Sequence, residues 1–314
     1  MIASLTGTMI AMQVLSFIAI VLLLVKFAGF GWLEAMIASA ALLLLARATV
    51  IVNNYFLSGA VRQPMADGSR VPRFALAQRI AREFWCSMLC WFWLFPFGRP
   101  FRILTSGDAA PPVLMLHGYG SNSGFWQPFS QRLQAAGISH AAIDLEPILA
   151  DIDDYAPQID AAVQSLCGAT GAPQVILLCH SMGGLAARAW LRACGSDRAA
   201  RVITLGTPHF GSTLAGYGMG TNARQMLTPA GNADSWIAQL DASENADVRA
   251  LFVSIYTRHD NIVSPQSSAI LPGGSHIALD LVGHVSLGFD DNAGKRVLAE
   301  ITSIRQSRLT AGSR

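Results

Sequence analysis

Residues 174–184 read Q-V-I-L-L-C-H-S-M-G-G, and this stretch decides how the C-terminal two thirds of the chain fold. Residues 175–178 are uniformly apolar, which is typical of a strand that is buried on both faces. The residues after Ser181 have helical composition, so this serine lies where a strand turns sharply into a helix. Gly183 and Gly184 allow the two backbones to approach closely at the turn. Such a turn exposes the serine hydroxyl and directs the N–H groups of the helix N-terminus toward developing negative charge.

A serine hydroxyl is a weak nucleophile unless a base accepts its proton and a third group orients that base. His284 follows the apolar run 276–282 and therefore lies in a loop at the end of a predicted strand. His276 also lies downstream, but it opens that run and is predicted to begin the strand. Asp260 directly follows another strand-like run. The sequence therefore predicts that Ser181, His284 and Asp260 form a nucleophile, a base and an orienting acid.

A site for a negatively charged oxygen is predicted after an earlier apolar run, residues 112–116. The sequence H-G-Y-G follows this run at residues 117–120, and its glycines allow backbone N–H groups to turn inward. We expect the N–H groups of Tyr119 and Met182 to be the two donors. Removing one such donor typically costs about 3–4 kcal/mol of transition-state stabilisation. The other predicted positions bind substrate or shape the surrounding loops, and they are His117, Gly118, His180, Gly183 and His209.

Residues 115–287 resemble bacterial lipases and esterases of the α/β-hydrolase family in four segments, which occur in the family's order. These are the serine turn, L-G-T-P-H-F-G-S at 205–212, D-N-I-V at 260–263 and G-H-V-S-L at 283–287. The resemblance implies an α/β-hydrolase fold and ester hydrolysis through an acyl-enzyme, which needs no cofactor. It also favours a structural role for His209. Cys179 departs from the family pattern, because it replaces the usual first glycine of G-x-S-x-G, but cysteine is also small.

Short apolar runs alternate with helix-compatible stretches over roughly the last two hundred residues. Alternation of this kind indicates an α/β fold with a doubly wound, mostly parallel sheet. The predicted strands are 113–116, 140–145, 175–178, 201–205, 252–257 and 276–282. The predicted helices are 127–136, 155–169, 184–193 and 292–305. The long connection 208–247 lacks a clear strand, and it is either a substrate-binding loop or lid, as in related lipases, or an ordinary surface insertion.

The N-terminal third belongs to a different physical class. The chain is 52% hydrophobic and only 13% charged, and the excess of apolar residues lies at the front. Residues 9–27 would span about 28 Å as a helix, which is close to the hydrocarbon thickness of a bilayer. A second apolar run follows at 32–52, with Arg47 near its end, where it could reach the interface. We expect a transmembrane hairpin within residues 1–58. The alternative is a cleaved signal peptide, but no basic residue precedes Lys26 and a second apolar run follows.

Residues 59–110 are predicted to be a basic and aromatic juxtamembrane linker. Its aromatic segment, residues 84–97, is too short to span a bilayer and is typical of an interfacial or re-entrant segment. The basic residues fit anionic lipid headgroups, and they are Arg62, Arg70, Arg73, Arg79 and Arg82. By the positive-inside tendency they favour a cytoplasmic catalytic domain at a bacterial inner membrane. If 84–97 crossed the membrane, the domain would lie on the other side.

The catalytic domain is predicted at residues 111–306, with a short tail at 307–314. We interpret the chain as a membrane-anchored serine hydrolase of carboxylic esters, and the anchor favours lipid acyl esters. Two alternatives remain open: a thioesterase or acyltransferase with the same three residues, and a non-catalytic membrane interaction protein that retains the fold. A formal net charge of +2 gives no nucleic-acid footprint, so the expected partners are an acyl-ester substrate and the membrane. The five cysteines show no metal-ligand spacing, and the sequence leaves the oligomeric state open.

Overall fold

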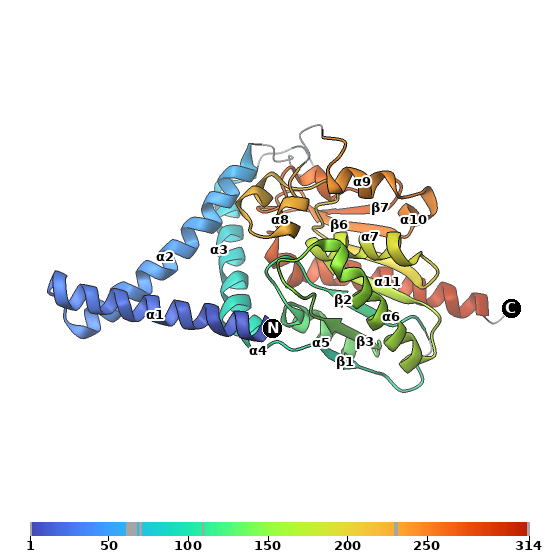
Figure 1. Ribbon diagram of the computed structural model, residues 1–314, viewed down its shortest axis with the longest axis horizontal. Helices are drawn as coiled ribbons and strands as arrows, with labels where there is room; N and C mark the ends of the chain where they lie inside the picture. The colour runs from blue at the N-terminus through green and yellow to red at the C-terminus, as the bar shows by residue number, and fades with distance from the viewer. Residues whose placement is uncertain (1, 61–67, 69–70, 109, 229–231, 313–314) are drawn as a thin grey trace.

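The computed structural model describes residues 2–60, 68, 71–108, 110–228 and 232–312, and it contains a sheet with a pair of helices projecting from one side (Figure 1). Seven strands are ordered β1-β3-β2-β4-β5-β6-β7 within this part of the chain. Strands β2 to β7 run parallel, and β1 pairs antiparallel with β3. The strands are Phe101–Ile103, Val113–Leu116, His140–Ile143, Val175–His180, Ala199–Leu205, Phe252–Thr257 and Ser275–Leu279. The prediction of a mostly parallel α/β sheet is confirmed.

The edge strand β1 is the one element of this sheet that the sequence pattern did not reveal. It has three residues, F-R-I, and its central Arg102 is exposed, so it forms no apolar run. It pairs with β3 in the register Phe101 to Ala142 and Ile103 to His140. The sheet therefore begins before residue 111, where the sequence pattern places the start of the domain.

Helices cover both faces of the sheet, and each face has its own core. On one face, α6 (Ala156–Thr170) and α7 (Met182–Cys194) pack against alternate residues of β2 and β4. On the other face, α5 (Gln127–Ala135) and α11 (Asp291–Gly312) pack against the intervening residues of the same two strands. Burial on both faces explains why β2 and residues 175–179 of β4 are apolar throughout. Helix α11 continues past residue 306, into the stretch predicted to be a tail.

The two N-terminal helices are α1 (Ile2–Ala28) and α2 (Trp32–Gly59). They pack against each other near Gly29–Gly31 and diverge toward the sheet, as a V whose tip points away from it (Figure 1). By length and composition, the segments Ile10–Ala28 and Trp32–Gly59 could each cross a membrane. A core helix or a signal sequence passes the same test, but here few of the side chains in either segment are buried. Helix α2 runs seven residues further than the predicted apolar run 32–52.

A third helical segment, residues 73–97, lies between the open end of the V and the sheet (Figure 1). It comprises α3 (Arg73–Leu89), a π-helical turn at Cys90–Leu94 and α4 (Phe95–Phe97), and we call it the bridging helix. Cys90 and Phe95 are buried in the core under β2 and β4, whereas the aromatic side chains on its other side are exposed. The aromatic stretch 84–97 is thus the end of a longer amphipathic helix that contributes to the core of the α/β domain.

Two of the five basic residues of this region, Arg79 and Arg82, contact protein. Arg79 is buried, with its guanidinium 5.3 Å from the centre of the Tyr55 ring. Arg82 forms a 2.8 Å ion pair with Asp290. Arg62 and Arg70 lie outside the described residues. The burial of Arg79 differs from the expectation that it contacts lipid headgroups, whereas Arg82 pairs with Asp290 and keeps 44% of its side chain exposed.

Candidate active site

Ser181 occupies a strained turn between β4 and α7. Its φ of 53° and ψ of −126° make it one of two non-glycine residues with positive φ in the described part of the chain. Such a conformation costs of the order of 1–3 kcal/mol and persists only where the surroundings enforce it. Gly183 enforces it by close approach, since a Cβ there would lie 2.7 Å from the His117 carbonyl oxygen. The Thr207 hydroxyl also donates a 2.9 Å hydrogen bond to the Ser181 carbonyl.

Cys179 fits the turn without distorting it. Its side chain is fully buried in the core between β4 and α7, two residues before the turn. Burial raises the pKa of its thiol, so it stays protonated and unreactive near neutral pH. A glycine is therefore not required at this position, and the departure from G-x-S-x-G leaves the serine turn intact.

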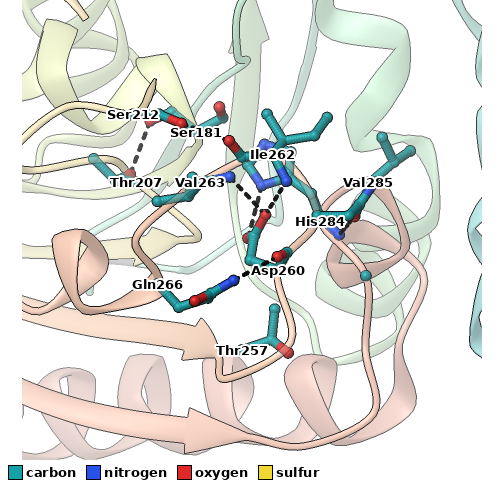
Figure 2. A network of polar contacts seen from close by, with 12 residues as sticks. Ser181, Thr207, Ser212, Thr257, Asp260, Ile262, Val263, Gln266, His284 and Val285 are labelled. Atoms are coloured by element: carbon teal, nitrogen blue, oxygen red, sulfur yellow. Dashed lines mark hydrogen bonds and ion pairs between the residues drawn. The ribbon is translucent and has the colours of Figure 1, made fainter. Parts of the chain in front are cut away.

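The structure brings Asp260 and His284 together in buried loops that follow β6 and β7 (Figure 2). The distance from His284 Nδ1 to Asp260 Oδ2 is 2.9 Å. The other carboxylate oxygen, Oδ1, accepts hydrogen bonds of 2.8 Å from the N–H groups of Ile262 and Val263. Asn261 Oδ1 accepts a 3.0 Å bond from the His284 N–H. Hydrogen bonds thus fix both carboxylate oxygens of Asp260, and they fix His284 at its backbone N–H and at its ring Nδ1.

The electrostatic surroundings of His284 favour its charged form. Burial by itself lowers the pKa of His284, but the Asp260 carboxylate raises it through charge and hydrogen bonding. A second carboxylate, Glu83, also raises it, and the net result is a pKa above the ordinary value. His284 is thus suited to accept a proton, and the resulting imidazolium would be stabilised by two carboxylates.

Ser181 and His284 face the same cavity, whose volume is about 1010 Å³. Within the described residues, no hydrogen bond links the serine hydroxyl to the histidine ring. Bonds of this kind are often long without substrate and tighten when substrate binds. The structure therefore brings the three predicted residues to one place, with the serine and the histidine both open to the cavity.

Of the two predicted oxyanion donors, Tyr119 lines the cavity, and Met182 directly follows Ser181 at the start of α7. In the described part of the chain, the backbone N–H groups of Tyr119 and Met182 make no hydrogen bond. Gly118 fits tightly beside the serine, because a Cβ on it would lie 2.8 Å from Ser181 Cβ. His117 holds this loop: its Nε2 accepts a 2.9 Å bond from the Leu145 N–H, and its Nδ1 lies 2.9 Å from the Gly118 carbonyl oxygen.

The other two predicted histidines have supporting positions. His180 Nε2 lies 3.1 Å from the His284 carbonyl oxygen, and its ring stacks on Phe125 with ring centres 4.2 Å apart. Burial and the charge of His284 lower the pKa of His180, so it stays neutral. His209 is buried away from the cavity, near the hydroxyls of Thr204 and Ser254. Both side chains thus stabilise the loops of the site.

Comparison with known proteins agrees with this fold. The profile of the alpha/beta hydrolase family matches residues 113–257. The crystal structure of mature Bacillus licheniformis lipase BlEst2 is similar, with a TM-score of 0.55 at 21% identity over 65% of this chain and 98% of that one. The chain has the α/β-hydrolase fold. Triacylglycerol lipases of Pseudarthrobacter phenanthrenivorans and Burkholderia plantarii are each 32% identical over 114 residues, 34% of this chain. The match spans 35% and 32% of those relatives, about a third of their length.

Glu83 is a residue of the candidate site that the sequence pattern did not reveal. It lies on the bridging helix and is only 1% exposed. Its two carboxylate oxygens accept bonds of 2.8 and 2.9 Å from the N–H groups of Val285 and Ser286, which directly follow His284. Burial raises the pKa of Glu83, and these two N–H bonds oppose that shift. No local motif connects residues about two hundred positions apart, so only the fold could identify it.

We expect Glu83→Gln to lower kcat by about 10- to 100-fold, because a misplaced catalytic group is costly. The amide oxygen can accept a hydrogen bond from only one of the two N–H groups. The amide NH₂ is a donor, so it repels the other N–H group. Glu83 also raises the pKa of His284. Activity requires neutral His284, so it is lost as pH falls through that pKa. Removing the charge lowers the pKa and shifts the acidic limb of the kcat/KM–pH profile to lower pH.

Gln78→Ala, on the exposed side of the same helix, is the matched control and should change neither kcat nor the pH profile. An acidic limb that stays in place in Glu83→Gln, despite a lower kcat, would contradict the electrostatic part of this prediction.

Cys179→Gly is expected to keep ester hydrolysis within a few-fold of the parent while lowering stability. Removing a buried side chain and placing glycine in a strand should reduce the free energy of unfolding by about 1–3 kcal/mol. Thermal unfolding in detergent and assay of a soluble ester measure the two effects, with the exposed Cys194→Gly as comparison. A folded Cys179→Gly protein without activity would show that the thiol has a chemical role.

Proposed function

We propose that this protein is a membrane-anchored serine hydrolase that cleaves carboxylic esters, with lipid acyl esters as its natural substrates. The observation that carries the proposal is the orientation of His284. Its Nδ1 is held 2.9 Å from Asp260, and the residue lines the same cavity as the strained Ser181. A fixed base that lines the same cavity as a serine nucleophile is the arrangement that acyl transfer requires.

The proposed reaction has two halves. His284 Nε2 takes the Ser181 proton as Oγ attacks the ester carbonyl carbon, and the N–H groups of Tyr119 and Met182 stabilise the negatively charged oxygen. The tetrahedral intermediate collapses, and His284 returns the proton to the leaving alcohol. Water then attacks the acyl-enzyme and gives a proton to His284, which reprotonates Ser181 as the carboxylic acid leaves. Asp260 keeps the histidine oriented throughout.

A panel of substrates tests the reaction class. The full-length protein in detergent should react with a fluorophosphonate probe and hydrolyse p-nitrophenyl esters, triglycerides or phospholipids. Faster turnover of acyl thioesters than of matched oxygen esters, or transfer of the acyl group to an added alcohol in preference to water, would favour the thioesterase or acyltransferase alternative. A folded protein that neither labels nor turns over any acyl compound would support a non-catalytic membrane protein.

The membrane anchor carries a prediction of its own. We expect the full chain to stay in the membrane pellet after both high-salt and alkaline carbonate washes. Its many exposed apolar side chains in α1 and α2 favour insertion, and hydrophobic insertion is not screened by salt. Immunoblotting of pellet and supernatant measures the partition. Release by carbonate would contradict the anchor, and an N-terminus found beyond residue 28 in the mature protein would favour the signal-peptide alternative.

Sidedness is the remaining part of the proposal. The positive-inside tendency supports a cytoplasmic hydrolase domain in a bacterial inner membrane. Both α2 and the bridging helix end on the side of the sheet, so that a single hairpin would leave the domain on the side where the chain begins (Figure 1). Protease protection of inside-out and right-side-out vesicles distinguishes the two orientations.

A further inference from the structure

The cavity beside Ser181 extends well beyond the hydrolase domain. Its volume of about 1010 Å³ is at the upper end of small-molecule sites. Among the described residues of the connection 208–247, none lines it. Its outer walls come instead from α1, α2 and the bridging helix, which are not part of the profile match at 113–257. The hairpin is therefore more than an anchor, because it completes the space in front of the serine.

One face of α2 supplies a long wall of this cavity. Most of the lining residues recur every three or four positions, and they are Ala40, Leu43, Leu44, Ala46, Arg47, Val50, Ile51 and Asn54. At 1.5 Å per residue this face extends for about 21 Å along the helix. Most of these side chains are apolar, as are Met12, Val14 and Phe17 of α1. An extended acyl chain fits such a wall, and the wall consists of helices that are proposed to lie in the bilayer.

Two charged residues, Arg47 and Glu83, line the described cavity. The Glu83 carboxylate already accepts two backbone N–H bonds. The Arg47 guanidinium lies 5.0 Å from the centre of the Trp91 ring, and within the described residues it has no ion pair or hydrogen bond. An arginine in apolar surroundings is costly unless an anion accompanies it, and an ionisable residue within a membrane segment marks a functional site by default.

We propose that the cavity binds a phosphate-bearing membrane lipid, with an acyl chain along α1 and α2, its ester at Ser181 and its phosphate at Arg47. This inference rests on the proposed ester hydrolysis. A neutral glyceride supplies an ester but no counter-charge for Arg47, and a free fatty acid supplies an anion but no ester. A phospholipid supplies both. Guanidinium and phosphate also match in geometry, because two parallel N–H···O bonds can form.

The headgroup test compares two lipids with identical acyl chains, phosphatidylglycerol and diacylglycerol, in maltoside micelles, which contain no phosphate. Full-length protein should have the higher kcat/KM on phosphatidylglycerol. Arg47→Met should lower the ratio of kcat/KM on phosphatidylglycerol to kcat/KM on diacylglycerol at least ten-fold. Arg47→Lys, which keeps the charge, should restore part of this ratio. An equal loss on both lipids, or a preference for diacylglycerol in the parent protein, would overturn the assignment of the phosphate.

The chain test uses two neighbouring alanines of α2. Both are exposed, but Ala40 lines the cavity and Ala41 does not. Ala40→Trp should lower the ratio of activities on p-nitrophenyl palmitate and p-nitrophenyl butyrate at least ten-fold, whereas Ala41→Trp should leave that ratio unchanged. Equal ratios in the two variants would overturn the assignment of this face of α2 as the binding site of the acyl chain. An unmodified protein that fails to hydrolyse the butyrate ester would instead refute the proposed function, so the two failures are distinguishable.

Discussion

Ser181→Ala is expected to abolish ester hydrolysis, lowering kcat by about four to six orders of magnitude. The fold should be unaffected, because the structural roles of this residue belong to its backbone: its N–H donates to the Leu205 carbonyl at 2.9 Å, and its carbonyl accepts from Thr207. Alanine keeps the same Cβ, so the cost of the positive φ does not change. Activity on a soluble ester, fluorophosphonate labelling and thermal unfolding together measure this prediction.

Ser87→Ala is the matched control for this change. Ser87 is another of the serines that line the cavity, and it lies on the bridging helix. This variant should label with the probe and should hydrolyse a soluble ester at a rate close to that of the parent. Turnover by Ser181→Ala within a few-fold of the parent, or loss of probe labelling only in Ser87→Ala, would show that the nucleophile was assigned to the wrong serine.

Sequence alone could predict the parts of the fold that depend on local pattern. The buried strand Val113–Leu116 is a continuous apolar run and Phe252–Thr257 is a mostly apolar one, and their predicted bounds agree with the structure. The serine turn is also local, because one strand, one serine and two glycines determine it. Asp260 and His284 could be proposed because each follows a strand, and parallel strands bring their carboxyl ends to the same edge of the sheet.

Contacts between distant segments could not be predicted in this way. Glu83 binds the loop after His284 across about two hundred residues, and nothing in its neighbourhood distinguishes it from a surface glutamate. The long wall of the cavity could not be predicted either. Resemblance to lipases left residues 208–247 as either a substrate-binding loop or lid or a surface insertion, whereas the apolar helices at the front supply that wall. The apolar composition of these helices predicts that they insert in a bilayer. It does not indicate whether they also line the active-site cavity.

The bridging helix shows why composition was a poor guide at residues 84–97. An aromatic run that is too short to span a bilayer is typical of an interface. The structure assigns its residues to two environments, because Cys90 and Phe95 enter the protein core while Trp93 and Phe97 stay exposed. A helix that packs on the sheet by one side and exposes aromatic rings on the other connects the hairpin mechanically to the hydrolase domain.

His284→Ala is expected to be nearly as damaging as Ser181→Ala, because the nucleophile and its base act as a unit. Their losses should not add: the double variant should be no less active than either single variant. Asp260→Asn should retain somewhat more activity than His284→Ala, since the histidine remains. In this variant, however, His284 loses the carboxylate that orients its ring and raises its pKa. Initial rates on a soluble ester over a wide range of enzyme concentration provide the necessary sensitivity.

His276→Ala is the comparison for this series, because His276 lies exposed on β7 and close in sequence to the base. It should retain the activity of the parent. The acidic limb of the parent should also lie above the ordinary histidine pKa of about 6.5, because Asp260 and Glu83 raise the pKa of His284 and activity is lost as pH falls through it. If His276→Ala were inactive while His284→Ala retained its rate, the base would be the histidine that opens β7, and the bond between His284 and Asp260 would serve only to hold two loops together.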